Sequence, residues 1–504
     1  METEIELKFF VSPEFSDVLL AKISENKVLQ HSRRELGNLY FDTADTWLRQ
    51  HDIGLRIRRF DDVFVQTVKT AGRVVAGLHQ RPEYNAEHDS DVPKLDLHPD
   101  DIWPVGKSVE ELEAQLTPLF ETNFTREQWL VALPDGSQIE VAFDQGEVIA
   151  KDKREPICEV ELELRSGQTE ALFTLARTLS EGGGMRLGNL SKAARGYRLA
   201  FDYPGDKPYE LDVVDVDADD SVELSFIQSL EHALAHWQYH EQVYMAQRDV
   251  QALHQVLHAL TFIRQIFSTY GNRVPRRASV LLRQEVKWLE DELAWVEQHA
   301  QLHALVDDKG HKLRKLDGRK VLLALLNERF DTLPTEDEVV QLLTCGRYTG
   351  LLLDLSRWVL SRGWQPFLDD KAKEKMNRPV TEYSQKQLQK LWLELQDTFA
   401  DDAPMSAQAF IDQKYRLQRN LYTGFSFAAL YDSEERNSFR LPWADLIHGI
   451  DDLLLLEQVE HFKEHLEGDE KEQLARWLIR KQSSILHAME QTLSMAKSAQ
   501  PYWQ

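Results

Sequence analysis

The spacing of the apolar residues changes once along this chain of 504 residues, close to residue 200. Before that point, apolar and polar residues alternate, which is the period of a strand with one buried face. After it, apolar residues recur every three to four positions, as on an amphipathic helix. A chain that separates its strands from its helices in this way is typical of the α+β class. We therefore predict an antiparallel β domain followed by an all-α helical bundle.

The predicted strands are short, and turn signals such as PDG at 134–136 separate several of them. They cover 3–11, 35–42, 53–60, 63–70, 78–87, 121–132, 137–144, 146–151 and 157–165, with a last short strand near 196–201. Helices are predicted to interrupt them at about 13–27, 108–118 and 168–182.

A strongly acidic segment separates the two periods. Residues 202–220, DYPGDKPYELDVVDVDADD, hold two prolines and eight acids but one lysine. This composition is typical of a linker or loop at a domain boundary. The predicted domains are therefore 1–200 and 221–504, joined by an acidic linker at 201–220.

Composition excludes several classes of protein. The formal net charge is −25, whereas bulk nucleic-acid binders usually present a basic surface. No apolar run approaches the length that crosses a bilayer, and the acidic start does not resemble a signal peptide. Cys158 and Cys345 are too few for a disulfide framework. We expect a cytoplasmic protein with no membrane partner, in which any polyanion binds at a local basic site.

The predicted strands concentrate charge on one face. The opening strand, METEIELKFF, alternates Glu4, Glu6 and Lys8 with an apolar stripe. Other strands carry charged faces that include Arg56, Arg58, Lys69, Arg81, Glu83, Arg126, Glu140, Asp144, Glu159, Glu161 and Glu163. For any single strand, a polar face in water is the simpler interpretation. Three glutamates in alternation nevertheless repel one another unless cations lie among them.

A closed sheet would give these charges a common purpose. In a barrel every second residue points inward, so the lumen would have a basic wall and an acidic wall, with the apolar stripes packed outside. Arginine and lysine bind phosphate oxygens, and clustered carboxylates supply the oxygen ligands that Mg²⁺ and Mn²⁺ prefer. The sequence offers no P-loop as a different phosphate cradle. The residues therefore favour a site for a triphosphate together with a divalent metal.

Five ordered motifs in residues 1–200 resemble one known family. They are EIELK at 4–8, LYFDT at 39–43, LRIR at 55–58, EVELEL at 159–164 and LSKAARGYRL at 190–199. Together they are similar to the CYTH domain of the triphosphate tunnel metalloenzymes. This resemblance implies a closed antiparallel β tunnel barrel with helical insertions, which binds or cleaves triphosphates with a divalent metal, Mg²⁺ or Mn²⁺.

The resemblance also implies roles for individual residues. The metal ligands it implies are Glu4, Glu6, Glu159 and Glu161, and Glu163 continues the same face. The implied phosphate clamp consists of Lys8, Arg56, Arg58, Lys69, Arg81, Arg126 and Lys192. Asp144 is a candidate for the metal–water side and Glu83 for a hydrogen bond in the tunnel. The predicted catalytic set is therefore Glu4, Glu6, Lys8 and Asp144.

The helical half resembles the CHAD domain, a helical module that often follows CYTH. In HQVLHALTFIR at 254–264, His254 and Arg264 remain, but Leu257, Thr261 and Phe262 stand where that family has basic residues. A second run, QKYRLQRNLYTGF at 413–425, keeps Lys414, Arg416 and Arg419. The resemblance implies docking of polyphosphate or of a protein.

These observations lead to one expected activity and several alternatives. We expect metal-dependent hydrolysis of inorganic triphosphate (tripolyphosphate) to diphosphate and phosphate, with this small polyphosphate as the substrate. Within the enzyme class, a thiamine triphosphatase or a class IV-like adenylate cyclase are the alternatives. Outside it, the barrel would be a non-catalytic polyphosphate-binding protein.

Overall fold

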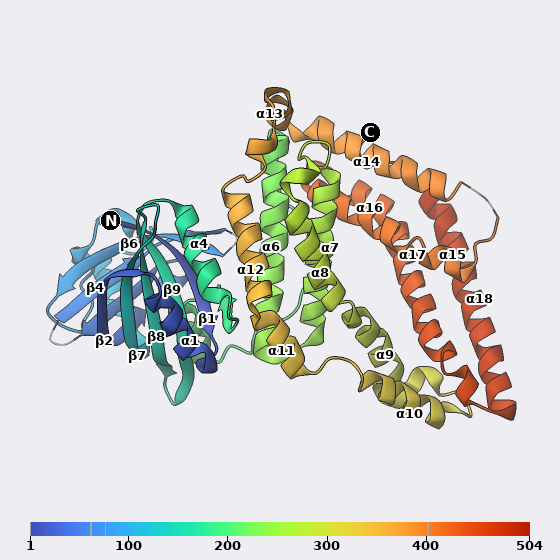
Figure 1. Cartoon of the computed structure of the whole chain (residues 1–504), viewed down its shortest axis with the longest axis horizontal. Coiled ribbons are helices and arrows are strands. Elements are labelled where there is room, and N and C mark those ends of the chain that lie inside the picture. Colours follow the sequence, from blue (N-terminus) through green and yellow to red (C-terminus); the bar gives the residue numbers. More distant parts are fainter. Residues whose placement is uncertain (1, 61–62, 76, 401–402) are drawn as a thin grey trace. The chain divides into compact units, whose positions relative to one another are not determined.

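The computed structural model describes residues 2–60, 63–75, 77–400 and 403–504. The chain forms two compact units. The barrel unit comprises Met1–Asp206 together with Val340–Gly363, and the helical unit comprises Lys207–Val339 and Trp364–Gln504. Figure 1 shows the strands gathered in the first unit and long helices in the second.

The barrel unit contains one antiparallel sheet that closes on itself. Its strands are β1 (Glu2–Val11), β2 (Lys27–Asp42), β3 (Gly54–Phe60), β4 (Val63–Lys69), β5 (Arg73–Val75), β6 (Leu78–His88), β7 (Thr117–Ala132), β8 (Gln138–Ala150), β9 (Lys153–Ser166) and β10 (Met185–Leu187). The strand order is β10-β1-β9-β8-β7-β2-β3-β4-β6-β5, and β6 also pairs with β1. That last pairing closes an eight-stranded barrel, which confirms the predicted fold class.

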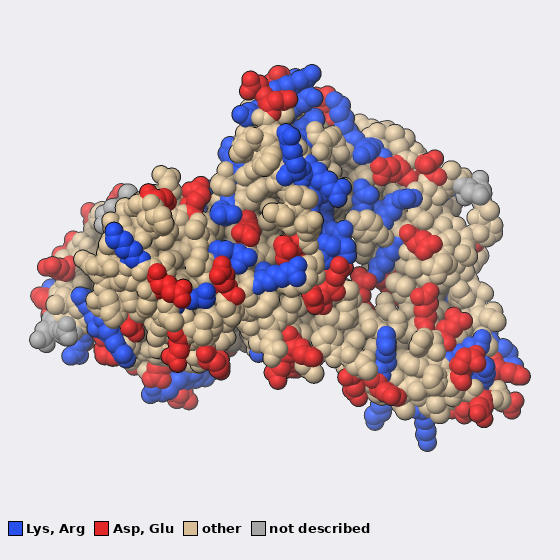
Figure 2. All heavy atoms as spheres, viewed as in Figure 1, with Lys and Arg blue, Asp and Glu red and all other residues tan. Residues whose placement is uncertain are grey.

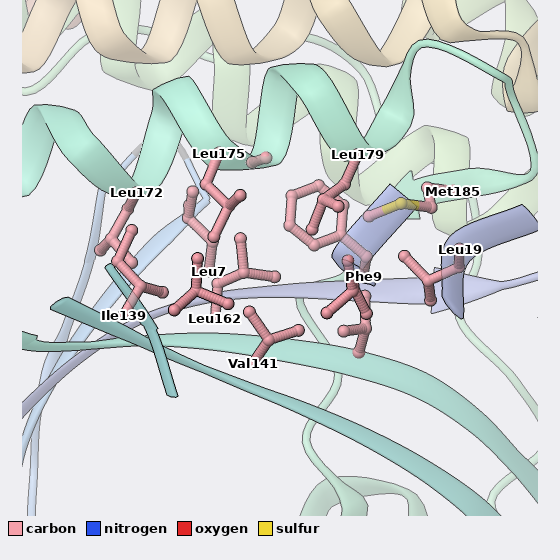
Figure 3. Packing of buried hydrophobic residues seen from close by; sticks show 14 of the residues in the cluster. Leu7, Phe9, Leu19, Ile139, Val141, Leu162, Leu172, Leu175, Leu179 and Met185 are labelled. Atoms are coloured by element: carbon pink, nitrogen blue, oxygen red, sulfur yellow. The ribbon is translucent and has the colours of Figure 1, made fainter. Parts of the chain in front are cut away.

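The apolar stripes of the strands pack on the outside of the barrel. Leu7 and Phe9 of β1 are fully buried beneath helices α1 (Ser16–Ser24) and α4 (Thr169–Ser180). Figure 3 shows these side chains and others from the sheet meeting leucines of α4. Leu353 of α12 (Gly346–Leu360) belongs to the same cluster. Because the pleat alternates, burying this face outside turns the charged face of each strand into the lumen.

Two further clusters complete the barrel unit. Leu55, Ile57 and Val68 form another outer core with residues 95–116, which include α3 (Val109–Gln115). At one end of the lumen, inward aromatic rings of β2 and β7 pack against α5 (Lys192–Ala200). This helix places charged side chains inside the barrel.

Two local predictions were wrong. Residues 196–201 belong mainly to helix α5 and not to a strand, because the Ser191 hydroxyl accepts a hydrogen bond from Ala194 N and caps the helix. The strands predicted at 137–144 and 146–151 form one strand, β8. Gly146 lies inside this strand and does not mark a turn. A Cβ at this position would lie 2.1 Å from the Asn123 carbonyl oxygen of β7, so the close approach of the two strands needs glycine here.

Residues 222–504 are mainly helical, as predicted. One of these helices, α12, belongs to the barrel unit. The others include α6 (Val222–Gln247), α7 (Val250–Thr269), α8 (Val280–Glu292), α9 (Trp295–Gly310), α10 (Arg319–Phe330), α11 (Glu336–Thr344), α13 (Asp370–Met376), α14 (Val380–Thr398), α15 (Ala407–Ile411), α16 (Lys414–Ser426), α17 (Ser433–Glu460) and α18 (Gly468–Ser498). In the predicted acidic linker, Val214 is buried, and its N–H donates to the Phe425 carbonyl at 3.0 Å. Among the described residues, no helix has the length and apolar content to cross a membrane.

Candidate active site in the barrel lumen

Strand register brings the predicted charged residues together. On β1 and β9, Glu6 lies opposite Glu163 and Lys8 lies opposite Glu161. Arg126 of β7 lies opposite Asp144 of β8, which in turn lies opposite Glu159 of β9. Residues that face each other across antiparallel strands share one side of the sheet. Charges more than 150 positions apart in the sequence therefore meet in the lumen.

Three carboxylates form the acidic cluster, which we define as Asp144, Glu159 and Glu161. Each offers an oxygen atom, and these atoms all lie within 4.8 Å of one another. The side chains of Asp144 and Glu159 are completely buried. Buried carboxylates need cations close by, and the barrel provides them.

Cations surround the acidic cluster. Arg126 donates to both oxygens of Asp144 at 2.7 Å and to Glu161 Oε2 at 2.8 Å. Lys8 Nζ lies 2.7 Å from Glu161 Oε1 and 3.8 Å from Glu6 Oε1. Burial by itself would raise the pKa of Glu161, but the nearby lysines and arginine hold it well below its usual range. Burial alone would lower the pKa of Lys8, but its carboxylate neighbours raise it well above the usual value. Glu161, Lys8 and Arg126 are therefore charged at neutral pH.

A second ion-pair group lies on β1, β4 and β6. Lys69 Nζ donates to Glu4 Oε2 and lies 2.8 Å from Glu83 Oε2. Burial alone would raise the pKa of Glu83, but Lys69 and Arg56 lower it to about 2. For Glu4, burial, assisted by Glu6 and Glu83, outweighs Lys69 and raises the pKa. In the structure Glu4 is thus a partner of Lys69 and not a member of the acidic cluster.

Arg58 and Arg56 of β3 have donor atoms that a neutral group occupies or that no described residue takes. Burial, with Arg56 and Arg126 nearby, lowers the pKa of Arg58 to about 9. Its Nε donates to Asn38 Oδ1 at 2.9 Å, and that acceptor is a neutral amide. Arg56 Nε is buried and has no hydrogen-bond partner among the described residues. Guanidinium groups held in this way have donors and charge to offer to an anion in the lumen.

One predicted clamp residue has other partners. Arg81 donates from Nε to the Thr70 carbonyl at 2.5 Å and from Nη2 to the Asp52 carbonyl at 2.8 Å. Its guanidinium therefore holds the segment before β3, at Asp52, to Thr70, the residue that follows β4. Its pKa is lowered, chiefly by burial.

Arg195, which the sequence left equally as a structural partner or a ligand, reaches the acidic cluster. Its side chain is buried and donates to Glu155 Oε1 at 2.6 Å and to Glu159 Oε2 at 3.2 Å. Arg195 lies three residues after Lys192 on α5, so both reach the same carboxylate. This helical spacing was the available signal for a ligand role, but helix α5 itself was not predicted.

Asp42 and Tyr197 were also missed, and they anchor α5. The Tyr197 hydroxyl donates to Asp42 Oδ2 at 2.8 Å, and Asp42 is fully buried. The same carboxylate accepts N–H groups of Thr43, Leu48 and Arg49. Asp42 therefore connects the loop after β2 to the helix that carries Lys192.

Removing this anchor is expected to destabilise the barrel unit. In Tyr197→Phe, the loss of a buried hydrogen bond to a charged acceptor is expected to lower the free energy of unfolding by about 1.5–3 kcal/mol, measured in urea. Tyr203→Phe is the matched control, because its hydroxyl donates to Asp206 Oδ1 at 2.9 Å on an exposed side chain. Equal losses in both variants would contradict the anchoring role.

Glutamates crowd the lumen near the end of β9. Burial raises the pKa of Glu163 to about 8, against the effect of Arg165, and Glu4, Glu140 and Glu6 raise it further. In the unfolded chain the carboxyl has its ordinary pKa near 4.5. Ionisation of Glu163 therefore lowers the free energy of unfolding. This loss is absent at pH 4 and reaches its full size above pH 8.

Glu163→Gln is expected to raise the melting temperature at pH 9 and to leave it unchanged at pH 4, with a chelator present throughout. The gain should grow between these pH values, because only there do the folded and unfolded carboxyl groups differ in charge. Glu121→Gln, whose position on β7 alternates with the inward residues, is the control. A gain of equal size at both pH values would contradict the raised pKa.

The acidic cluster fits a divalent metal. Its donors are all carboxylate oxygens, the ligands that Mg²⁺ and Mn²⁺ prefer, and they converge within 4.8 Å. Of the predicted ligands, Glu159 and Glu161 lie in this cluster and Asp144 joins them. Glu6 and Glu163 lie opposite each other one step along β1 and β9.

Two parts of the chain match known protein families. Residues 2–197 match the CYTH domain family, and residues 228–455 match the CHAD domain family. An inorganic triphosphatase from Haemophilus influenzae is 40% identical over 204 residues, which make up 40% of this chain and 55% of the relative. The chain thus spans about half the length of that curated relative.

Solved structures are more distant. The CHAD domain of the plant Ricinus communis aligns with 57% of this chain and 97% of its own, at 20% identity and a TM-score of 0.43. A candidate adenylyl cyclase from Hippeastrum, described with a dominant triphosphatase activity, aligns with 38% of this chain and 95% of its own, at 19% identity and a TM-score of 0.29. The family matches establish that this chain combines a CYTH domain over residues 2–197 with a CHAD domain over residues 228–455.

Proposed function

We propose that the barrel unit is a metal-dependent inorganic triphosphatase, which hydrolyses tripolyphosphate to diphosphate and phosphate. The observation that carries this proposal is the pairing of an acidic cluster with a basic wall inside one closed barrel. A triphosphate has the negative charge that Arg56 and Arg58 can bind, and a divalent cation has the positive charge that the acidic cluster can bind. The similarity to the Haemophilus influenzae inorganic triphosphatase supports the same substrate class.

The residues divide the work by charge. Arg56, Arg58 and Arg126 bind phosphate oxygens, and their fixed positions offset charge that develops as the terminal phosphorus–oxygen bond breaks. Asp144, Glu159 and Glu161 would hold the metal. When bound, a divalent metal neutralises phosphate charge and makes a coordinated water more acidic. Water supplies the oxygen atom that joins the terminal phosphoryl group, and diphosphate is the leaving group.

Lys69 and Lys8 complete the clamp in this proposal. Lys69 is 24% exposed at its side chain, and Lys8 is 6% exposed. Both are paired with carboxylates, so they offset the repulsion between the glutamates as well as offering charge to phosphate. Glu83 keeps its negative charge at neutral pH and fixes Lys69 through the 2.8 Å contact.

Turnover of three triphosphates tests the substrate. Tripolyphosphate, ATP and thiamine triphosphate are compared at equal concentrations with Mg²⁺ or Mn²⁺, and kcat/KM is measured for each. We expect tripolyphosphate to give the largest value. Faster formation of cyclic AMP from ATP would contradict the proposal, as would faster hydrolysis of thiamine triphosphate. Binding of tripolyphosphate without any hydrolysis would instead favour a non-catalytic polyphosphate-binding protein.

For the helical half we propose a docking role for polyphosphate or for a protein. Lysines on α13 support it, and Figure 2 shows Lys and Arg gathered on the helical unit, with acidic residues beside them. If the full chain retains long-chain polyphosphate whether or not tripolyphosphate is present, this result would support polyphosphate as the docking partner.

We also propose a cytoplasmic location, which both free cysteines fit.

A further inference from the structure

Lys192 occupies the position that a divalent cation would have to take. Its Nζ lies 2.6 Å from Asp144 Oδ2 and 3.2 Å from Glu161 Oε1, and it also donates to Glu159 Oε1. These are the three members of the acidic cluster. One ammonium group with three donors thus serves all of them.

The ammonium group of Lys192 offsets the repulsion among three carboxylates that lie close together. Asp144 and Glu159 are 0% exposed, and Lys192 itself is 6% exposed. Carboxylates buried so close together would be strongly destabilising without a cation. Lys192 is therefore a built-in counter-ion of the acidic cluster.

An ammonium group and a divalent cation compete for the same oxygen atoms. Mg²⁺ binds carboxylate oxygens at about 2.1 Å, and a buried ammonium held against those oxygens would be strongly repelled. When a divalent cation takes the cluster, the ammonium of Lys192 has to leave it.

The backbone of α5 is held in place, so only the side chain is free to move. Arg195 binds Glu155, and Tyr197 binds Asp42, both on the same short helix as Lys192. The Phe124 ring lies 5.1 Å from Lys192 Nζ. Phe124 shares the inward face of β7 with Arg126, two positions away. A displaced ammonium group thus remains in the lumen, beside the basic wall.

We propose that Lys192 is an exchangeable counter-ion. Together with Arg126, Arg195 and Lys8, it balances the charge of the acidic cluster before a divalent metal binds. It turns toward the phosphate chain when the metal takes its place. Metal binding then creates one more phosphate-binding cation, so the two ligands bind cooperatively. This inference rests on the proposed function for the identity of the phosphate ligand, whereas the exchange itself concerns the metal alone.

Lys8 provides an internal comparison. Its ion pairs are with Glu161 at 2.7 Å and Glu6 at 3.8 Å, so it touches the cluster at one member. Removing its charge should affect metal binding less than removing that of Lys192. Lys153 is a control of the same residue type, because it pairs with Asp202 and its side chain is 45% exposed.

The test measures Mn²⁺ affinity of the metal-free full chain by electron paramagnetic resonance. Lys192→Met is expected to bind Mn²⁺ at least tenfold more tightly than the wild-type chain, Lys8→Met less than tenfold, and Lys153→Met equally to wild type. Mn²⁺ should also tighten the binding of inorganic phosphate in the wild-type chain and much less in Lys192→Met. An unchanged or weaker Mn²⁺ affinity in Lys192→Met would overturn the proposal.

A folding defect does not prevent the test. If Lys192→Met unfolds without metal, its melting is followed with Mn²⁺ and with NaCl of equal ionic strength. Refolding with Mn²⁺ alone supports the exchange, and failure of Mn²⁺ to restore folding overturns it.

Hydrolysis is assayed separately in the wild-type chain. Hydrolysis there, without tighter Mn²⁺ binding in Lys192→Met, would overturn the exchange and leave the proposed function intact; the opposite pair of results would overturn the function alone.

Discussion

Glu159→Gln is expected to lower kcat for tripolyphosphate hydrolysis by a factor of about 100–1,000, the cost of removing one preorganised charge-stabilising group. Glu159 is fully buried and lies in the acidic cluster that would hold the metal. Glutamine keeps the size of the side chain but removes its charge. Phosphate release at saturating Mn²⁺ measures the effect, and circular dichroism confirms that the variant is folded.

The matched control for this substitution lies on the same strand. Glu155→Gln removes a carboxylate of β9 that binds Arg195 and whose side chain is 41% exposed. It is expected to retain most of the wild-type kcat. If Glu159→Gln hydrolysed tripolyphosphate as fast as Glu155→Gln, the acidic cluster would have no part in the reaction.

Arg58→Met is expected to lower kcat/KM for tripolyphosphate by a factor of about 10–100, since a hydrogen bond to a charged group contributes about 1.5–3 kcal/mol. The same substitution is expected to raise the melting temperature at pH 7. Burial and the neighbouring arginines lower the pKa of Arg58 to about 9, so below that pH the folded state carries a cation that its surroundings disfavour. Steady-state kinetics and thermal melting are the two measurements.

Arg59→Met is the control for this second variant, because Arg59 follows Arg58 on β3 and is exposed on the opposite face. It should change neither quantity appreciably. A lower melting temperature for Arg58→Met, with unchanged kinetics, would mean that Arg58 is a structural residue and not part of a phosphate site. The expected fall in kcat/KM and rise in melting temperature have opposite signs, so together they distinguish a functional role from a structural one.

Much of the site followed from local sequence. The alternation of Glu159, Glu161 and Glu163 on one face of a strand predicted their shared side, and β9 confirms that pattern. The closed antiparallel barrel was predicted from the resemblance of five motifs to the CYTH domain, and the charged faces of the strands fit such a barrel. By contrast, the strand predicted at 196–201 was wrong, since β-like composition in six residues cannot outweigh the cap that Ser191 gives to α5.

Other features depended on contacts that local patterns do not encode. Arg81 alternates with Glu83 like a lumen residue, yet its guanidinium ends on the carbonyl groups of Thr70 and Asp52. The anchoring of Tyr197 by Asp42 joins residues 155 positions apart. Such partners become neighbours only when loops and helix α5 pack against the closed sheet.

The sequence by itself determined which side chains lie on one face of each strand, because the period of two is a property of the extended backbone. It also determined the change from strands to helices, because apolar spacing follows the geometry of each element. Only the tertiary structure decided which charges meet. Strand register and barrel closure place Lys192 among Asp144, Glu159 and Glu161, and leave Glu4 with Lys69. Ion pairing depends on distance in space, which closure of the sheet sets and spacing along the chain does not.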